Sequence, residues 1–185
     1  VMALLSKPVA AALVAAFLLA PLSAQAQEGA SEAVADPRAQ DSVWHAEQQI
    51  YLLGLTAEDG WHFVDGGLRW RWLTYRASDR KPTVADRVTV HYEGRLLDGT
   101  VFDSSYARGE PATFPLGRLV KGWQLAVPQM GVGEVIEIAI PADLAYGPVG
   151  RGPIPANATL VFKVELIGIE PVSYTHLTLP TKRIV

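Results

Sequence analysis

The chain has 185 residues and a formal net charge of −3, a length that suits one ordinary domain with extensions. It contains no cysteine, which excludes disulfide bonds, thiolate metal ligands and a cysteine nucleophile. Within residues 27–170, 19 acidic side chains outnumber 13 basic ones, so this part of the chain lacks the positive surface with which proteins bind nucleic acid or anionic lipid.

The first 26 residues follow the pattern of a secretory signal peptide. A short basic start at residues 2–7 precedes an unbroken apolar run at 9–20, and Ala24-Gln25-Ala26 supplies a small-x-small cleavage site. The run is shorter than the roughly 20 apolar residues that span a bilayer. The sequence therefore predicts that residues 1–26 are cleaved and that the remainder is periplasmic, with no membrane attachment.

A flexible linker and a short helical extension are predicted next. Residues 27–40 are rich in Ala, Glu and Asp and contain no aromatic side chain, which is typical of a linker. Asp41 or Ser42 then caps a helix that runs to about Leu53, because apolar side chains recur there at helical spacing. Gly54 and the following Glu-Asp-Gly cluster end it, so residues 41–65 form the predicted extension.

The first predicted strand contains two tryptophans and two arginines. Leu68, Trp70 and Trp72 alternate with Arg69 and Arg71, which gives one apolar face and one charged face. An aromatic and basic surface for single-stranded nucleic acid is an alternative interpretation. In an acidic domain, a half-buried strand with a charged outer face is favoured.

A hairpin follows, and then two more strands and a helix. Residues 88–96 alternate between apolar and polar, Asp98-Gly99 is a strong hairpin signal, and the returning strand carries Phe102 beside Asp103. Further alternating strands are predicted at 136–140 and 160–166. A short helix fits residues 121–129, with Pro128 tolerated near its end. Antiparallel strands covered by one helix make an α+β domain.

Conventional catalytic motifs do not appear in the sequence. His45, His62 and His91 are scattered without a helical i, i+4 pair, so no metal site is expected. There is no Gly-x-Ser-x-Gly motif and no dinucleotide fingerprint. The glycine-rich residues 147–152 lack the Lys-Ser/Thr of a phosphate-binding loop. No cofactor is therefore expected.

Four segments, taken together, carry a family resemblance. VHYEGRLLDGTVFDSS at 90–105, LVKGW at 119–123, ADLAYG at 142–147 and IPANATLVF at 154–162 are similar, in this order and spacing, to the FKBP family of macrolide-binding peptidyl-prolyl cis-trans isomerases. The resemblance covers about residues 66–170. It implies a twisted antiparallel β-sheet wrapped over one short α-helix, with a ligand pocket between them.

The resemblance also bears on the two ends of the chain. Some secreted members of the family dimerise through a long helical amino-terminal arm, and the helix predicted to end near Leu53 is too short for that role, so a monomer is expected. Residues 171–185 follow the last predicted strand and resemble an adapter-derived translated tail. They are predicted to be disordered and not native.

By resemblance, nine residues would form the pocket: Tyr92, Phe102, Asp103, Leu119, Val120, Trp123, Tyr146, Ile154 and Phe162. Asp103, Tyr146 and Tyr92 are assigned to catalysis. Tyr146 would donate a hydrogen bond to the substrate carbonyl, and Asp103 would orient the site, held by Tyr92 and Arg108. Tyr92 and Phe162 lie at core-facing strand positions and would be buried in any fold, so neither marks a pocket alone.

The implied activity is rotation about the bond that precedes proline in exported polypeptides. This rotation requires no nucleophile, because the barrier of about 18–20 kcal/mol comes from amide resonance. A twisted amide loses that resonance and is less polar, so an apolar pocket binds it better than the planar form. Macrolide inhibitors are further expected ligands. The alternatives are a chaperone module that holds unfolded chains with little turnover, and an interaction scaffold that does not use the pocket.

The sequence departs from the family pattern in three segments. Ala112 stands where many members have Phe, which is expected to thin one wall of the pocket. Residues 117–121 are fewer than usual, with Arg118 near a position that is often acidic. Residues 150–153 are also shortened, with Arg151 near a frequent His. These segments carry substrate and macrolide contacts, so the resemblance does not transfer detailed specificity.

Overall fold

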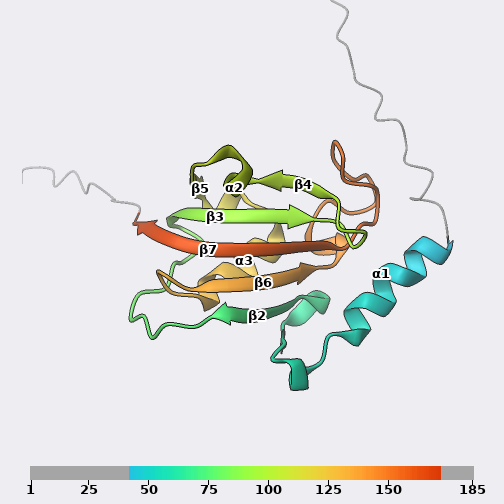
Figure 1. Cartoon of the computed structure of the whole chain (residues 1–185), viewed down its shortest axis with the longest axis horizontal. Coiled ribbons are helices and arrows are strands. Elements are labelled where there is room, and N and C mark those ends of the chain that lie inside the picture. The colour runs from blue at the N-terminus through green and yellow to red at the C-terminus, as the bar shows by residue number, and fades with distance from the viewer. Residues whose placement is uncertain (1–41, 172–185) are drawn as a thin grey trace, which may run out of the picture. The chain divides into compact units, whose positions relative to one another are not determined.

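Antiparallel strands account for most of the regular structure in the chain (Figure 1). The computed structural model describes residues 42–171, so the predicted signal peptide, linker and tail lie outside the described residues. The strands are β1 His62–Phe63, β2 Arg69–Thr74, β3 Arg87–Arg95, β4 Val101–Ser104, β5 Ala112–Pro115, β6 Val135–Ile140 and β7 Leu160–Glu170.

The strands of the described residues form one sheet in the order β1-β2-β6-β7-β3-β4, and every pairing is antiparallel. β5 also pairs with β3 and shares one edge of that strand with β4. β4 lies opposite residues 93–95, and β5 lies opposite residues 87–90. The short helix α2, Ser105–Arg108, connects them, so its position is determined at both ends by β3.

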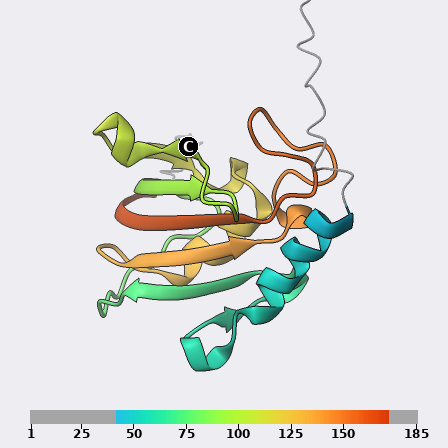
Figure 2. The same cartoon turned by 45° about the vertical axis from the view of Figure 1, so that its right-hand side comes forward.

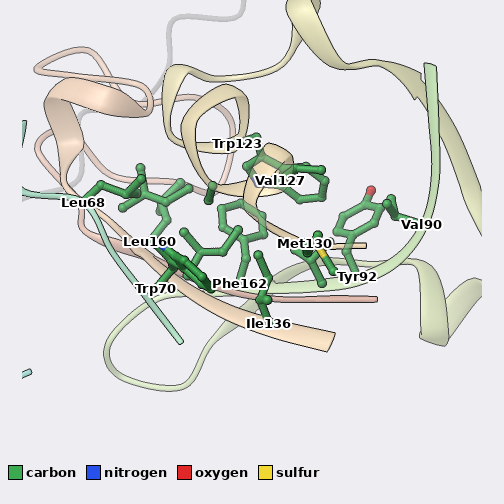
Figure 3. Packing of buried hydrophobic residues seen from close by; sticks show 14 of the residues in the cluster. Leu68, Trp70, Val90, Tyr92, Trp123, Val127, Met130, Ile136, Leu160 and Phe162 are labelled. Atoms are coloured by element: carbon green, nitrogen blue, oxygen red, sulfur yellow. The ribbon is translucent and has the colours of Figure 1, made fainter. Parts of the chain in front are cut away.

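The main core lies between one face of this sheet and helix α3, Lys121–Ala126 (Figure 3). Val88, Val90 and Tyr92 alternate toward it from β3, as the sequence pattern predicts. The β6 isoleucines at 136, 138 and 140 are fully buried. Trp123 and Val127 face them from the helix side, so one short helix covers the centre of the sheet.

Helix α1, Ser42–Gly54, is attached to the opposite face of the sheet (Figure 2). Leu52 packs with Trp61 and with Ala139, whose side chain points away from those of its buried neighbours on β6 because strand side chains alternate. Gln48 is buried, and its side-chain carbonyl accepts a 2.9 Å hydrogen bond from the Thr159 backbone N–H. The predicted short amino-terminal helix is confirmed.

The charged face of β2 also contributes to this second surface. Glu137 on β6 accepts hydrogen bonds from Arg71 at 2.9 Å and from Arg95 at 2.8 Å. The Arg71 guanidinium also lies 4.7 Å from the centre of a Trp61 ring. Arg71 of the predicted first strand therefore links β2 to β6 and to the Trp61 ring, in agreement with a half-buried strand.

The predicted α+β fold is confirmed, with differences at short elements. The helix predicted at 121–129 is α-helical to Ala126 and continues as a 3₁₀ turn, η5 Val127–Gln129, which contains Pro128. β1, α2 and β5 were not predicted. No helix among residues 42–171 has the length and apolar character required to cross a membrane.

Candidate active site

A cavity of about 400 Å³ opens between α3, the sheet and the loop that follows β6. The nine pocket residues named from the resemblance all line it, and Arg108 binds two of them from outside. Four further residues line it: Phe114, which the sequence analysis did not name, and Arg151, Gly152 and Pro153, which it named only as part of the shortened segment 150–153. The lining is mostly apolar, so the cavity is suited to an uncharged, compact group such as a proline ring.

Trp123 forms the floor of the cavity and organises its aromatic side chains (Figure 3). Only 4% of this residue is exposed, and its ring meets the rings of Tyr92 and Phe162 edge-on at centroid distances of 5.6 and 5.4 Å. Phe162 in turn meets Phe102 edge-on at 5.5 Å. Such perpendicular contacts stabilise each ring pair beyond simple burial, so the walls keep a defined shape.

Two glycines allow close packing around the cavity, one beside the aromatic rings and one between α3 and β6. A Cβ atom at Gly94 would lie 2.6 Å from ring atoms of both Phe102 and Phe162. A Cβ atom at Gly122 would lie 2.4 Å from the Cγ2 of Ile140. The absence of a side chain at Gly122 therefore lets the start of α3 lie directly against β6, which determines the depth of Trp123.

Asp103 is the acid of the cavity, and two partners hold it. The Tyr92 hydroxyl donates to Asp103 Oδ2 at 2.5 Å, and the Arg108 guanidinium donates to Oδ1 at 2.5 Å. The same guanidinium donates to the Tyr92 hydroxyl oxygen at 2.9 Å, which closes a ring of three interactions. The aspartate, tyrosine and arginine expected to act together are thus in direct contact.

The pKa shifts of this group follow from its surroundings. Partial burial acts to raise the pKa of Asp103, but the hydrogen bonds from Tyr92 and Arg108 and the arginine charge outweigh it, so the pKa lies below its usual value. Burial raises the pKa of the Tyr92 hydroxyl, and its bond to Asp103 raises it further. At neutral pH the site therefore contains a carboxylate, a neutral phenol and a guanidinium.

Helix α2 brings Arg108 to this group. The Ser104 hydroxyl caps the helix by accepting from the Ala107 N–H at 3.2 Å, and Gly109 ends it in the left-handed region with a φ of 77°. The Ser105 hydroxyl, which is fully buried, accepts from the Tyr92 backbone N–H at 2.7 Å. This bond ties the first residue of α2 to the strand that carries Tyr92.

The loop after β6 places Tyr146 at the cavity. The 3₁₀ turn η6, Ala142–Leu144, is closed by a 2.9 Å hydrogen bond from the Gly147 N–H to the Ala142 carbonyl. Asn157 donates back to the Gly147 carbonyl at 2.8 Å. Within residues 42–171 nothing hydrogen-bonds to the Tyr146 hydroxyl, so it is available as a donor to a bound molecule.

The aromatic wall contributed by β5 differs from the sequence expectation. Ala112 does not line the cavity, whereas Phe114, two residues further along the same strand, lines it and meets the Tyr92 ring at 5.9 Å. The two residues share a face of the strand, which is a signal that could have identified Phe114.

The described residues contain no group of three or more His, Cys, Asp or Glu side chains with a geometry that could hold a metal ion. The cavity offers apolar walls, the Tyr146 hydroxyl, the Arg151 guanidinium and one acid already paired with Arg108. Such an arrangement can bind and reorient a substrate without covalent chemistry.

Comparison with known proteins gives one family. The family model described as FKBP-type peptidyl-prolyl cis-trans isomerase matches residues 78–167. FK506-binding protein 1A of Aspergillus fumigatus is 50% identical over 91 residues, which are 48% of this chain and 81% of that protein.

A bacterial relative matches over a longer stretch. The FKBP-type peptidyl-prolyl cis-trans isomerase FkpA of Aeromonas hydrophila is 44% identical over 140 residues, 76% of this chain and 51% of the relative. The crystal structure of FkpA from Escherichia coli superposes with a TM-score of 0.66 at 37% identity, covering 69% of this chain and 60% of that one. The chain thus spans about half the length of the first bacterial relative that it matches.

Proposed function

Since the chain belongs to the FKBP-type peptidyl-prolyl cis-trans isomerase family, we propose that it accelerates rotation about X-Pro peptide bonds in polypeptides. The observation that carries the proposal is the apolar cavity above Trp123, with an unpartnered Tyr146 hydroxyl beside it and an acid already neutralised by Arg108. Each of these features serves a reaction in which no bond is made or broken.

The cavity favours the twisted amide over the planar one. Planar amides are the more polar form and lose more hydration on entering apolar walls, so binding lowers the barrier to rotation. A hydrogen bond from Tyr146 would hold the substrate carbonyl while the proline nitrogen turns. Lowering the barrier by about 5–6 kcal/mol corresponds to an acceleration of roughly 10⁴-fold.

The ion pair between Asp103 and Arg108 affects how the cavity receives a substrate carbonyl. A free carboxylate at an apolar wall would repel the partial negative charge of a carbonyl oxygen, but the Arg108 guanidinium lies 2.5 Å from it and offsets that charge. The Asp103–Tyr92–Arg108 group therefore acts as a rigid, nearly neutral side of the cavity rather than as a general base.

The proposal is tested by measuring isomerisation of an X-Pro peptide and binding of the same peptide in parallel. We expect Asp103→Leu and Tyr146→Phe to reduce kcat/KM by at least about tenfold while changing peptide affinity less, because a lost hydrogen bond to a charged or reacting group costs about 1.5–3 kcal/mol. Trp123→Ala should weaken both properties, because it removes the floor of the cavity.

Circular dichroism and thermal unfolding of each variant provide the folding control. Unchanged rates in folded Asp103→Leu and Tyr146→Phe proteins would show that the catalytic assignment is wrong. The alternative function, a chaperone module that holds unfolded chains, would then be favoured, since the same apolar cavity could bind proline-containing segments without turnover.

Macrolide binding follows from the same proposal. The Aspergillus fumigatus relative is named FK506-binding protein 1A, and the residues that resemble the family's pocket line a single cavity in this chain. FK506 should therefore compete with peptide, with an affinity altered by the shortened segment that carries Arg151. Full isomerase activity at saturating FK506, measured alongside direct drug binding by calorimetry, would argue against a shared cavity.

We further propose that the protein acts in the bacterial periplasm as a monomer, with residues 66–170 as the isomerase domain and residues 41–65 as an extension. The basic and apolar pattern of residues 2–26 supports export, and the attachment of α1 to β6 through Leu52 and Ala139 supports a helix used within its own chain. Sedimentation equilibrium of the exported protein tests the oligomeric state.

A further inference from the structure

Arg151 is a charged side chain that the proposed mechanism does not use. Of the described residues that line the cavity, only Asp103 and Arg151 carry charge. The Asp103 carboxylate is paired with Arg108, whereas the Arg151 guanidinium has no hydrogen bond or ion pair within residues 42–171. The rim of the cavity therefore has an uncompensated positive charge, although the domain as a whole is acidic.

The backbone around Arg151 is firmly held. Its N–H donates to the Ile154 carbonyl at 2.9 Å, and the Ile154 N–H donates back to the Arg151 carbonyl at 3.0 Å. Ile154 is buried and is itself part of the cavity wall. Gly150 precedes this pair with a φ of 70°, and a Cβ there would lie 2.4 Å from the Ile154 carbonyl oxygen. The loop can therefore take only a narrow range of shapes.

The side chain of Arg151 extends from this loop to Tyr146. Its guanidinium carbon lies 5.6 Å from the centre of the Tyr146 ring, within the range of a cation–π contact. Tyr146 is the proposed donor to the substrate carbonyl, so the guanidinium lies beside the residue that marks the position of the reacting amide. The five N–H donors of an arginine are arranged to bind a carboxylate through two parallel hydrogen bonds.

We infer that Arg151 selects substrates that carry a carboxylate next to the proline, namely Glu or Asp immediately before or after it. This inference rests on the proposed function, because it assigns a preference among its substrates. Arg151 is exposed at the rim, so solvent screens its attraction to a substrate carboxylate. The effect is that of a partly solvated pair, which corresponds to about a two- to fivefold preference.

The test uses the full chain and two peptide series. In one series the residue before proline is Glu, Gln or Lys, and in the other the residue after proline is varied in the same way. Isomerisation is followed by NMR exchange spectroscopy, which requires no protease with its own charge preference. In at least one series, at low ionic strength, kcat/KM should be about two- to fivefold higher for Glu than for Gln and lowest for Lys.

Three variants assign the preference to Arg151. Arg151→Gln should bring the Glu-to-Gln ratio to about one, and Arg151→Glu should favour Lys over Gln. Arg80→Gln removes the same charge from an exposed position that does not line the cavity, and it should retain the parental ratio. Comparing ratios within each variant isolates the pairwise effect from any general change in rate.

The outcomes separate this inference from the proposed function. Isomerisation of all peptides with equal Glu-to-Gln ratios in the parent and in Arg151→Gln would overturn the inference and leave the isomerase function in place. A ratio that falls equally in Arg80→Gln would also overturn it, because the preference would then come from total charge. Failure of the folded parent to isomerise even the Gln peptides would instead contradict the proposed function.

Discussion

Asp103 lies where a phenol and a guanidinium both donate to one carboxylate, and its ionisation depends on them. Because its folded pKa lies below the ordinary value of 3.8, the bound carboxylate contributes stability that is fully present above that value. The contribution is lost as the pH falls through the folded pKa. Solvent reaches 43% of the side chain, so screening limits the contribution to about 1 kcal/mol at most.

A comparison with Asp103→Asn tests this ionisation. We expect the parent to be the more stable protein at pH 7 in urea unfolding, and the difference to shrink below pH 3.8 and vanish at lower pH. Both proteins lose stability in acid through their other carboxylates, so only the difference between them reports on Asp103. A difference that stays constant between pH 7 and pH 2 would contradict the assigned direction of the pKa shift.

Gly94 is a single residue on which the shape of the cavity depends. Gly94→Ala should destabilise the fold by about 1–3 kcal/mol and lower isomerase activity, because the new methyl group requires the space of the Phe102 and Phe162 rings. Gly168→Ala is the matched control on β7, since a Cβ there meets only Thr89, at an ordinary 3.8 Å. Equal effects of the two substitutions on unfolding midpoint and activity would show that the ring contact is not the cause.

Sequence reasoning identified some site residues and missed others for physical reasons. The contact between Tyr92 and Asp103 could be predicted, because a hairpin places the two consecutive strands that carry them side by side. Arg151 was noticed only as a departure from the family, because its contact with Tyr146 depends on a loop shape that two glycines with positive φ, Gly150 and Gly152, make possible. Such a shape has no periodic signature in a sequence.

Among the elements, α1 contacts the domain through the buried Gln48, through Leu52 in the small apolar cluster and through Trp44, which packs against the main core. Gln48→Ala removes the acceptor of the buried Thr159 N–H and should destabilise the protein by about 1–3 kcal/mol, the cost of leaving such a donor unpaired. Gln49→Ala, on the exposed side of the same helix, is the control and should have little effect. Thermal unfolding measures both, and similar small shifts would show that the Gln48–Thr159 hydrogen bond contributes little to stability.

Apart from β4, which the hairpin signal at Asp98-Gly99 predicted, the predicted elements were those long enough to display a period. β3, β6 and β7 have six residues or more, and their alternating apolar positions are buried, although Glu137, Ala139 and Val161 between them are buried too. β1 has two residues, both exposed, and α2 has four, too few to reveal a strand or helix pattern. β5 ends at Pro115 and depends on pairing with β3 rather than on its own propensity.

At the level of the whole chain, the proposed domain limit at residue 170 can be tested directly. β7 ends at Glu170, and both buried apolar clusters consist of residues that precede it. Deleting residues 172–185 should therefore change the melting temperature by less than about 2 °C, since a loss of 1 kcal/mol would shift it by roughly 2–8 °C. A decrease of about ten degrees would place part of the stability in the deleted segment.

The position of β7 in the sheet also has a consequence for how the protein is made. β3 and β6 do not pair with each other, and each pairs with β7, which is the last strand among residues 42–171. While residues 160–170 are still inside the ribosome, β1, β2 and β6 form one group of strands and β3, β4 and β5 form another, and no strand pairs with both groups. Completion of the sheet must therefore wait until synthesis has passed Glu170. Because these pairings join residues far apart in the sequence, the chain should fold more slowly than a helical protein of similar size. For the export proposed above, this delay would let a translocation channel accept the chain before it closes into its native form.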